Sequence, residues 1–291
     1  MSRHFLLIGM PVGHSLSPAL HRFWFRQYKL DATYRAQQVA ASELADFVDA
    51  VRKHGDIHGF NVTAPHKQAI VPLLDRLDHT AQLLDAVNTV CCEDGIFTGY
   101  NTDGEGFSDS LAPYISARER MCTNVLILGA GGAAAAVALT LAQKGYAAVD
   151  VANRTLARGQ ALSARCNRYC LSSAMPFSDV PRRLGKYRLV INATSSGLNS
   201  RSDMLFDDWS AAQPGTLFCD LVYRPRRTPF LAAAERFGFN VMDGLPMLVG
   251  QGAAAFACWM GGMQPDQPSA LKYLESAIEM KSETKSESGC E

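Results

Sequence analysis

The sequence predicts an α/β protein with two domains, and three features of the 291-residue chain indicate this fold class. Apolar runs typical of strands alternate with helical patterns along the chain, as in βαβ units with a largely parallel sheet. The chain is longer than one hydrophobic core usually grows. The segment "NVLILGAGGAAAAVALTLAQKG" reads as a strand, a glycine turn and a small-residue helix, so a second domain begins near residue 105.

The first half of the chain divides into strands and helices at clear boundary signals. The expected strands cover 4–9, 32–39 and 57–63, and the expected helices cover 18–29 and 42–55. Ser17 is expected to cap the first helix, with Pro18 at its first position. Ser42 is expected to cap the second helix, and Gly55 to end it.

The second half continues the alternation and ends in helices. Strands are expected at 147–152, 187–193 and 215–221, and two final helices at about 246–260 and 268–280. No strand follows these helices, so we expect them to fold back onto the first domain. The predicted boundaries are 1–104 for the first domain, 105–245 for the second, 246–280 for the returning helices and 281–291 for a disordered polar tail.

Composition and charge exclude several classes of function. The 28 basic and 28 acidic side chains balance, which gives no electrostatic case for nucleic acid or an anionic membrane. The first apolar run is too short for a signal peptide, and no segment approaches the ~20 apolar residues that cross a bilayer. Eight cysteines without a CxxC spacing favour reduced thiols and no metal site. We therefore expect a cytoplasmic monomer or homodimer whose partner is a small molecule.

The glycine turn predicts a dinucleotide cofactor. Gly129, Gly131 and Ala134 form GxGxxG/A between a strand and a helix, where the backbone can approach a pyrophosphate at the helix N-terminus. The next strand ends at Arg154, and Arg158 follows one helical turn later, where an NAD enzyme carries Asp or Glu. Two guanidiniums suit the 2′-phosphate of NADP, so NADP is favoured over NAD. The alternative is that both arginines are solvated and inert.

Polar side chains cluster at three places where strands are expected to end. "NVTAPHK" carries Asn61, Thr63 and Lys67; "DAVNT" carries Asn88; "GYNTDGEG" carries Asp103. In an open α/β sheet the strand ends form the ligand crevice, so these side chains are expected to converge on one pocket. Taken singly, each also fits a surface, turn or capping role.

The motifs together resemble the shikimate dehydrogenase family. "HSLSP", "NVTAPHK", "DAVNT", "GYNTDGEG", "GAGGAA", "NRT", "INATSSG", "DLVY" and "DGLPMLVGQGAAAF" occur in the family's order and at about its spacing, from about residue 5 to residue 280. The resemblance implies a substrate domain joined to a Rossmann-type doubly wound nucleotide domain, with the last helices returning to the first. It also implies NADP-dependent reduction of 3-dehydroshikimate to shikimate in aromatic amino-acid biosynthesis.

The same resemblance assigns roles to residues of this chain. Lys67 would be the general acid or base, and Asp103 would orient it. Residues implied in substrate binding are Ser15, Ser17, Asn61, Thr63, Asn88, Asp103, Tyr223 and Gln251. Residues implied in cofactor binding are Gly129, Ala130, Gly131, Gly132, Ala133, Asn153, Arg154, Thr155, Arg158, Thr194, Leu221 and Gly244.

Two positions depart from the commoner family pattern, and two other functions stay open. His66 stands where Phe is usual, so it could change the environment of the neighbouring lysine, and Arg22 replaces a frequent amide. Met247 and Phe256 are expected in the core.

The alternatives are a quinate or dual quinate/shikimate dehydrogenase using NAD or NADP, and a non-catalytic protein that senses a cofactor or metabolite.

Overall fold

The computed structural model describes residues 2–194 and 205–287, which fall into two compact units. Unit 1 comprises residues 1–102 and 249–291, and unit 2 comprises residues 103–248. The chain therefore changes unit directly before Asp103, which the sequence had placed in the first domain. The final helices belong to unit 1.

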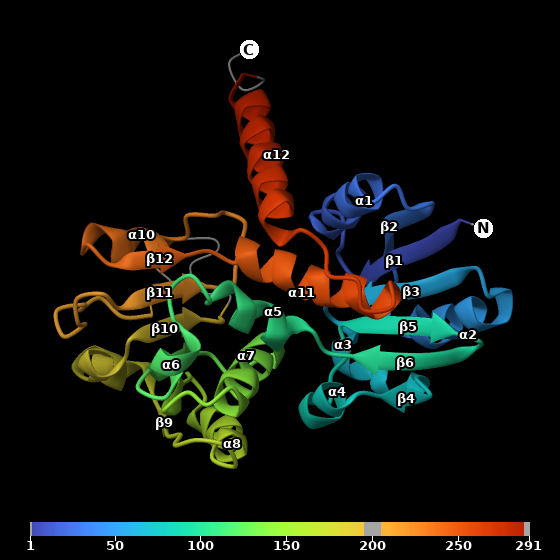
Figure 1. Cartoon of the computed structure of the whole chain (residues 1–291). Helices are drawn as coiled ribbons and strands as arrows, with labels where there is room; N and C mark the ends of the chain where they lie inside the picture. The colour runs from blue at the N-terminus through green and yellow to red at the C-terminus, as the bar shows by residue number, and fades with distance from the viewer. Residues whose placement is uncertain (1, 195–204, 288–291) are drawn as a thin grey trace. The chain divides into compact units, whose positions relative to one another are not determined.

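Unit 1 contains a six-stranded mixed sheet with the strand order β2-β1-β3-β5-β6-β4 (Figure 1). Its strands are β1 (Arg3–Gly9), β2 (Ala32–Gln38), β3 (Ile57–Val62), β4 (Arg76–Leu77), β5 (Thr89–Glu93) and β6 (Ile96–Tyr100). Its helices are α1 (Ser17–Gln27), α2 (Leu44–His54), α3 (His66–Ala69), α4 (His79–Leu84) and α12 (Gln267–Glu287), together with most of α11 (Leu245–Trp259). Buried residues of β1, β3, β5 and α2 make its core.

The expectation of a largely parallel sheet is wrong for β5, which runs antiparallel to both β3 and β6. The antiparallel pairing with β6 follows from a two-residue hairpin turn, Asp94–Gly95, in which both residues have positive φ. An Asp-Gly pair between strand-forming residues is a strong hairpin signal, because both residues tolerate this conformation. This turn was not among the predicted elements.

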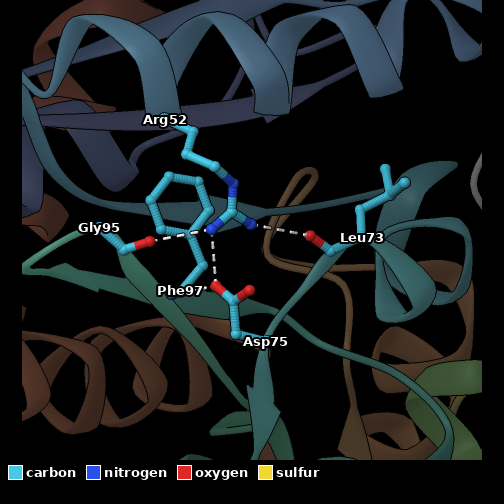
Figure 2. Close-up of polar contacts among 5 residues, drawn as sticks. All are labelled: Arg52, Leu73, Asp75, Gly95 and Phe97. Carbon is cyan, nitrogen blue, oxygen red and sulfur yellow. Dashed lines mark hydrogen bonds and ion pairs between the residues drawn. The ribbon is translucent and has the colours of Figure 1, made fainter.

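Arg52 of α2 fastens this hairpin to the rest of unit 1 (Figure 2). Its guanidinium donates to Asp75 Oδ2 at 2.8 Å, to the Gly95 carbonyl at 2.9 Å and to the Leu73 carbonyl at 3.4 Å. The guanidinium carbon lies 4.3 Å from the centre of the Phe97 ring. The backbone N–H of Phe97 also donates to Asp75 Oδ2, at 2.7 Å, so one carboxylate joins the segment before β4 to β6 and α2.

Unit 2 contains a six-stranded sheet in which every pair is parallel, with the order β12-β11-β10-β7-β8-β9 (Figure 1). This is the doubly wound order in which the first strand lies beside the point where the winding reverses. Its strands are β7 (Asn124–Leu128), β8 (Ala148–Ala152), β9 (Ala174–Met175), β10 (Leu189–Asn192), β11 (Leu217–Asp220) and β12 (Asn240–Met242). Its helices are α5 (Asp103–Ser110), α6 (Ala117–Arg120), α7 (Gly132–Gln143), α8 (Leu156–Cys166), α9 (Val180–Arg183) and α10 (Pro229–Arg236).

One local prediction needs correction, and one helix boundary and one core prediction hold. Ser42 lies inside a short 3₁₀ turn, Ala41–Glu43, and does not cap α2; the Glu43 carboxylate accepts the Ala40 N–H instead. Gly55 does end α2, in the left-handed conformation. Phe256 is fully buried and Met247 is 9% exposed, as expected for core side chains.

The C-terminal tail contains more helix than predicted. Helix α12 continues to Glu287, so residues 281–287 are helical, and residues 288–291 lie outside the described part of the chain. Glu and Lys are good helix formers, so a polar run need not end a helix.

The part of the "INATSSG" motif from residue 195 onward also lies outside the described residues.

Candidate functional site

The polar clusters of unit 1 come together at one edge of its sheet. Strand β3 ends beside Asn61, and β5 begins at Thr89, which pairs with Asn61 on one side and with Tyr100 at the end of β6 on the other. Asn88 precedes its strand rather than following it, contrary to prediction. Because β5 is antiparallel, however, its beginning lies at the same edge as the ends of its neighbours.

A buried hydrogen-bond network connects these residues. Asn61 Nδ2 donates to the Asn88 carbonyl at 3.2 Å and to Thr89 Oγ1 at 3.0 Å. Thr89 Oγ1 donates to Asn88 Oδ1 at 3.0 Å, and Asn88 Nδ2 donates to Thr102 Oγ1 at 2.9 Å. Thr102 Oγ1 donates in turn to the Gln251 carbonyl at 3.0 Å, which ties α11 to the same network. Both asparagine amides are therefore held in fixed orientations.

Ser15 and Ser17 lie at the start of α1, and Ser17 does not cap this helix as the sequence predicted. The N-cap position is Leu16, with no side-chain cap, and Ser17 is the first helical residue. The Ser15 hydroxyl accepts the Ser17 N–H at 3.2 Å and donates to Ser17 Oγ at 3.2 Å. Ser15 thus orders the helix start, while Ser17 is 6% exposed and faces the core side of α1.

Lys67 is held by a short segment that follows β3. The Thr63 N–H donates to the Ile8 carbonyl at 2.9 Å, and the Lys67 carbonyl accepts the Val87 N–H at 2.7 Å. The buried His66 imidazole lies 2.7 Å, through Nε2, from the Val39 carbonyl. His66 therefore anchors α3 to the loop after β2.

Arg22, the second position that departs from the family pattern, makes a hydrogen bond within its own helix, α1. Its Nε donates to the Pro18 carbonyl at 2.8 Å, and the side chain is exposed. The guanidinium thus adds a second donor to a carbonyl in the first turn of α1.

In unit 2 the glycine turn is shaped as a dinucleotide site requires. Gly129 has a φ of +112° and its N–H donates to the Ala152 carbonyl at 2.8 Å, so the turn closes over the end of β8. Gly131 is the N-cap of α7. A Cβ at Gly131 or Gly132 would meet no atom within 4 Å, so the protein's own packing does not require glycine there. The open space beside the N-terminus of α7 fits a pyrophosphate.

The predicted adenosine end of the site lies between β8 and α8. Asn153 Nδ2 donates to the Thr155 carbonyl at 2.8 Å, and Thr155 is the N-cap residue of α8. Arg154 and Arg158 are exposed, and neither guanidinium makes a hydrogen bond or ion pair with another described residue. Both are available to an anion, and the sequence from Ala152 to Arg158 contains no Asp or Glu.

The predicted nicotinamide end is organised by Asp220, which the sequence analysis did not single out. Asp220 Oδ2 accepts from Asn192 Nδ2 at 3.0 Å and from Thr228 Oγ1 at 2.8 Å, and Oδ1 accepts the Val222 N–H at 3.0 Å. Burial raises the pKa of Asp220, and these three donors act in the opposite direction. Asn192 Oδ1 accepts the hydroxyl proton of Thr194 at 2.7 Å.

Gly244 completes this end through a close backbone contact. Its N–H donates to the Val222 carbonyl at 3.0 Å, and a Cβ at this position would stand 2.6 Å from the carbonyl carbon of Leu221. Only glycine fits here without displacing the backbone. The structure therefore brings Thr194, Leu221 and Gly244 to the carboxyl end of β10 and β11.

Asp103 and Tyr223 belong to unit 2, whereas the other predicted substrate residues belong to unit 1. Asp103 is buried and is the first residue of α5. Its pairing with Lys67 stays a prediction.

Among the described residues there is no group of three His, Cys, Asp or Glu side chains that could hold a metal ion. No helix in residues 2–194 or 205–287 has the length and apolar character of a membrane span.

Comparison with known proteins gives consistent matches over both units. The shikimate dehydrogenase substrate-binding domain family matches residues 7–90, and the shikimate / quinate 5-dehydrogenase family matches residues 114–226. A shikimate dehydrogenase (NADP(+)) from Shouchella clausii is 39% identical over 283 residues, with 96% of this chain and 99% of the relative covered.

Two solved structures share the fold. Shikimate 5-dehydrogenase from Thermus thermophilus in complex with NADP(H) and shikimate is 36% identical, with a TM-score of 0.84 and coverage of 94% of this chain and 99% of the other. Quinate dehydrogenase from Corynebacterium glutamicum in complex with NAD is 30% identical, with the same TM-score of 0.84 and coverage of 94% and 99%.

The doubly wound sheet, the glycine turn and the separate mixed-sheet unit define a two-domain α/β dehydrogenase. The predicted fold class is thereby confirmed. The chain belongs to the shikimate dehydrogenase family, which confirms the resemblance drawn from its motifs.

Proposed function

We propose that the chain catalyses the reversible, NADP-dependent reduction of 3-dehydroshikimate to shikimate. The observation that carries the proposal is the network at the edge of the unit 1 sheet. It gathers side-chain amide and hydroxyl groups from β3, the start of β5 and the segment after β6, and joins them to a backbone carbonyl of α11, in a chain whose relatives are named for this reaction. Such groups suit a substrate with several hydroxyls and one carboxylate.

Lys67 acts in this proposal as the proton donor for ketone reduction and as the base in the reverse direction. The cofactor supplies the hydride. Negative charge then develops on the substrate oxygen, and an ammonium group within hydrogen-bond distance both stabilises that charge and provides the proton. The half-buried Lys67 is held in place by the backbone bond from Val87. Asp103 orients the ammonium and binds a substrate hydroxyl.

The nucleotide is bound in this proposal by unit 2. The residues from Gly129 to Ala133 receive the pyrophosphate, and Asn153, Arg154, Thr155 and Arg158 receive the adenosine end. Thr194, Leu221 and Gly244 surround the nicotinamide. The two exposed arginines favour NADP, because their guanidiniums can pair with a 2′-phosphate that a carboxylate would repel. Ser15, Ser17, Thr63 and Tyr223 bind the substrate carboxylate, and Asn61, Asn88, Asp103 and Gln251 bind its hydroxyls.

The second candidate is a quinate or dual-specificity dehydrogenase, since a quinate dehydrogenase shares 30% identity with the chain. Retention of both serines leans toward shikimate. Kinetics with both acids and both cofactors decide between them, and a large advantage for quinate with NAD would overturn the first proposal. The cytoplasmic location and the monomeric or dimeric state stay predictions.

The direct test is an absorbance assay of NADP reduction with shikimate, applied to the parent protein and to Lys67→Ala. General acid–base catalysis contributes about 10²–10⁴-fold, so kcat should fall by a factor in this range while KM changes little. Lys53→Ala, which removes an exposed lysine at the end of α2, is the matched control. Near-normal turnover of Lys67→Ala removes this lysine from the mechanism. If the parent protein binds the cofactor but oxidises neither shikimate nor any other cyclohexene or cyclohexane polyol, this result supports the non-catalytic alternative.

A further inference from the structure

Asp220 is a buried carboxylate of unit 2 to which the proposed reaction gives no part. It ends β11, is 1% exposed, and accepts hydrogen bonds from Asn192 Nδ2 at 3.0 Å, from Thr228 Oγ1 at 2.8 Å and from the Val222 N–H at 3.0 Å. Asn192 and Thr228 are also only 1% exposed. Three donors at this depth offset the cost of burying a carboxylate, and the carboxylate in turn holds these donors in fixed orientations.

The orientation of the Asn192 amide is decided by a backbone N–H. Asn192 Oδ1 lies 3.1 Å from the backbone nitrogen of Thr194, and a backbone N–H can only donate. The amide oxygen must therefore face Thr194. The amide nitrogen then faces Asp220, whose Oδ2 accepts from it. Asp220 thus holds the amide by its nitrogen.

The direction of the Thr194 hydroxyl proton follows from this orientation. Thr194 Oγ1 lies 2.7 Å from Asn192 Oδ1. An amide oxygen can only accept, so the hydroxyl donates its single proton to it. Toward any further partner Thr194 Oγ1 offers only lone pairs. Asp220, acting through one amide, therefore makes this hydroxyl a hydrogen-bond acceptor.

Thr194 lies beside the glycine turn. The Ala193 N–H donates to the Leu128 carbonyl at 2.9 Å, which ties this end of β10 to β7. A Cβ at Gly129 would stand 3.0 Å from Thr194 Cγ2, so the threonine methyl packs against the turn. The Thr194 side chain is partly exposed, in contrast to the buried amide and carboxylate behind it. A group bound at the turn can therefore reach it.

We propose that Asp220 is a positioning residue that fixes Thr194 as an acceptor for an N–H or O–H donor of the nicotinamide nucleoside. The inference deepens the proposed function and rests on its assignment of Thr194 to the nicotinamide end. The nucleoside carries such donors in its carboxamide group and in its ribose hydroxyls. A pyrophosphate oxygen can only accept, so the same hydroxyl disfavours a pyrophosphate displaced toward β10.

The first test measures the dissociation constant for NADP by titration calorimetry without shikimate. Thr194→Val keeps the shape of the side chain and removes the acceptor, so the dissociation constant should rise about three- to tenfold. Thr194→Ser keeps the hydroxyl and should stay within about twofold of the parent. No change in Thr194→Val would overturn the proposal.

The second test repeats Thr194→Val in an Asp220→Asn background. The new amide must keep its oxygen toward the Val222 N–H, so its nitrogen faces the Asn192 nitrogen. Two amide nitrogens cannot bond to each other, so the Asn192 amide turns over and no longer fixes the Thr194 proton. Thr194→Val should then change the dissociation constant less than about twofold.

Asp208→Asn is the matched control background. Asp208 is an exposed carboxylate of the same unit that accepts the Ser210 N–H at 2.9 Å. Thr194→Val should keep its full effect in this background. An effect of Thr194→Val that is equal in the parent and in Asp220→Asn would mean that Asp220 does not act through Thr194, and the proposal fails.

The acetylpyridine analogue of NADP distinguishes the two sources of the donor, because it carries a methyl group in place of the carboxamide nitrogen. If the carboxamide donates, the effect of Thr194→Val should disappear with this analogue. If a ribose hydroxyl donates, the effect should be the same with both cofactors. Either result supports the acceptor role of Thr194 and identifies the group that it binds.

A neutron structure of the deuterated, ligand-free protein tests the proton direction without any variant. The Thr194 deuteron should point to Asn192 Oδ1, and the amide deuterons of Asn192 should lie on the atom that faces Asp220. A Thr194 deuteron that points elsewhere refutes the inference, even if Asp220→Asn does not fold. A parent that binds NADP without oxidising shikimate refutes the proposed reaction instead, and the calorimetric comparison still decides the role of Asp220.

Discussion

Gly104, the residue after Asp103, allows α5 and α7 to pack unusually close together in unit 2, and Gly104→Ala should separate them. A Cβ at this position would stand 2.6 Å from the Ala136 carbonyl oxygen and 2.7 Å from Thr140 Cβ, whereas ordinary contact begins at 3.4 Å. The helices must therefore separate by 3.4 − 2.6 = 0.8 Å or more. A carbonyl oxygen within a helix cannot rotate away.

The expected cost combines two effects of opposite sign. Overpacking costs about 1–3 kcal/mol, and replacing glycine by alanine within a helix returns about 1 kcal/mol. Because the blocking atom belongs to the backbone, the overpacking cost should lie in the upper part of its range, about 2–3 kcal/mol. The net loss in the free energy of opening α5 and α7 is then about 1–2 kcal/mol. Amide hydrogen exchange in both helices should become roughly 5–30 times faster.

Hydrogen exchange followed by mass spectrometry measures this change directly. Gly132→Ala is the matched control, because a Cβ there meets no atom within 4 Å, and exchange in α7 should not accelerate. Adding Thr140→Ala to Gly104→Ala should restore protection only in part, since the carbonyl of Ala136 remains in the way. Unchanged exchange in Gly104→Ala would show that the close approach does not constrain these helices.

Two further predictions concern charge. Asp75 has a lowered pKa, mainly through the Phe97 N–H and then through Arg52, so its ionised form stabilises the fold above its unfolded pKa of about 4. This contribution is lost as the pH falls through the folded pKa. Asp75→Asn should therefore reduce protection of the β5–β6 hairpin by about 0.5–1 kcal/mol at neutral pH, since the pair is about one-third exposed. The difference from the parent should vanish below the folded pKa, and one that persists there would contradict the assignment. Separately, Arg154→Ala and Arg158→Ala should each raise the KM for NADP about tenfold and leave the KM for NAD within about twofold. Arg168→Ala is the control for loss of an exposed arginine beyond α8, and equal effects on both cofactors would refute recognition of a 2′-phosphate.

Much of the nucleotide unit could be predicted from the sequence, because its signals are local. The strand, the turn with Gly129 and Gly131 and the helix that follows are contiguous, and so is the step from β8 to Arg158. The motif order was sufficient to identify the family. The sequence analysis also expected the final helices to group with the first domain, and residues 249–291 do belong to unit 1.

The substrate unit was predicted less completely, because its decisive contacts join distant positions. The antiparallel β5 could have been found from Asp94–Gly95, which is a local signal. The partnership of Tyr34 with Asn61 could not, since 27 positions and a helix separate them. Likewise, the sequence indicates only that Asp220 ends a strand, and its hydrogen bonds from Asn192 and Thr228 are found only in the structure.

The sequence by itself determined the alternation of strands and helices, the glycine turn and the kinds of side chain that gather at the sheet edges. Only the tertiary structure decided which donor faces which acceptor, such as Asn61 Nδ2 toward the Asn88 carbonyl. The physical reason is that hydropathy and backbone preferences act over a few neighbouring residues. The direction of a buried hydrogen bond, in contrast, depends on every group packed around it.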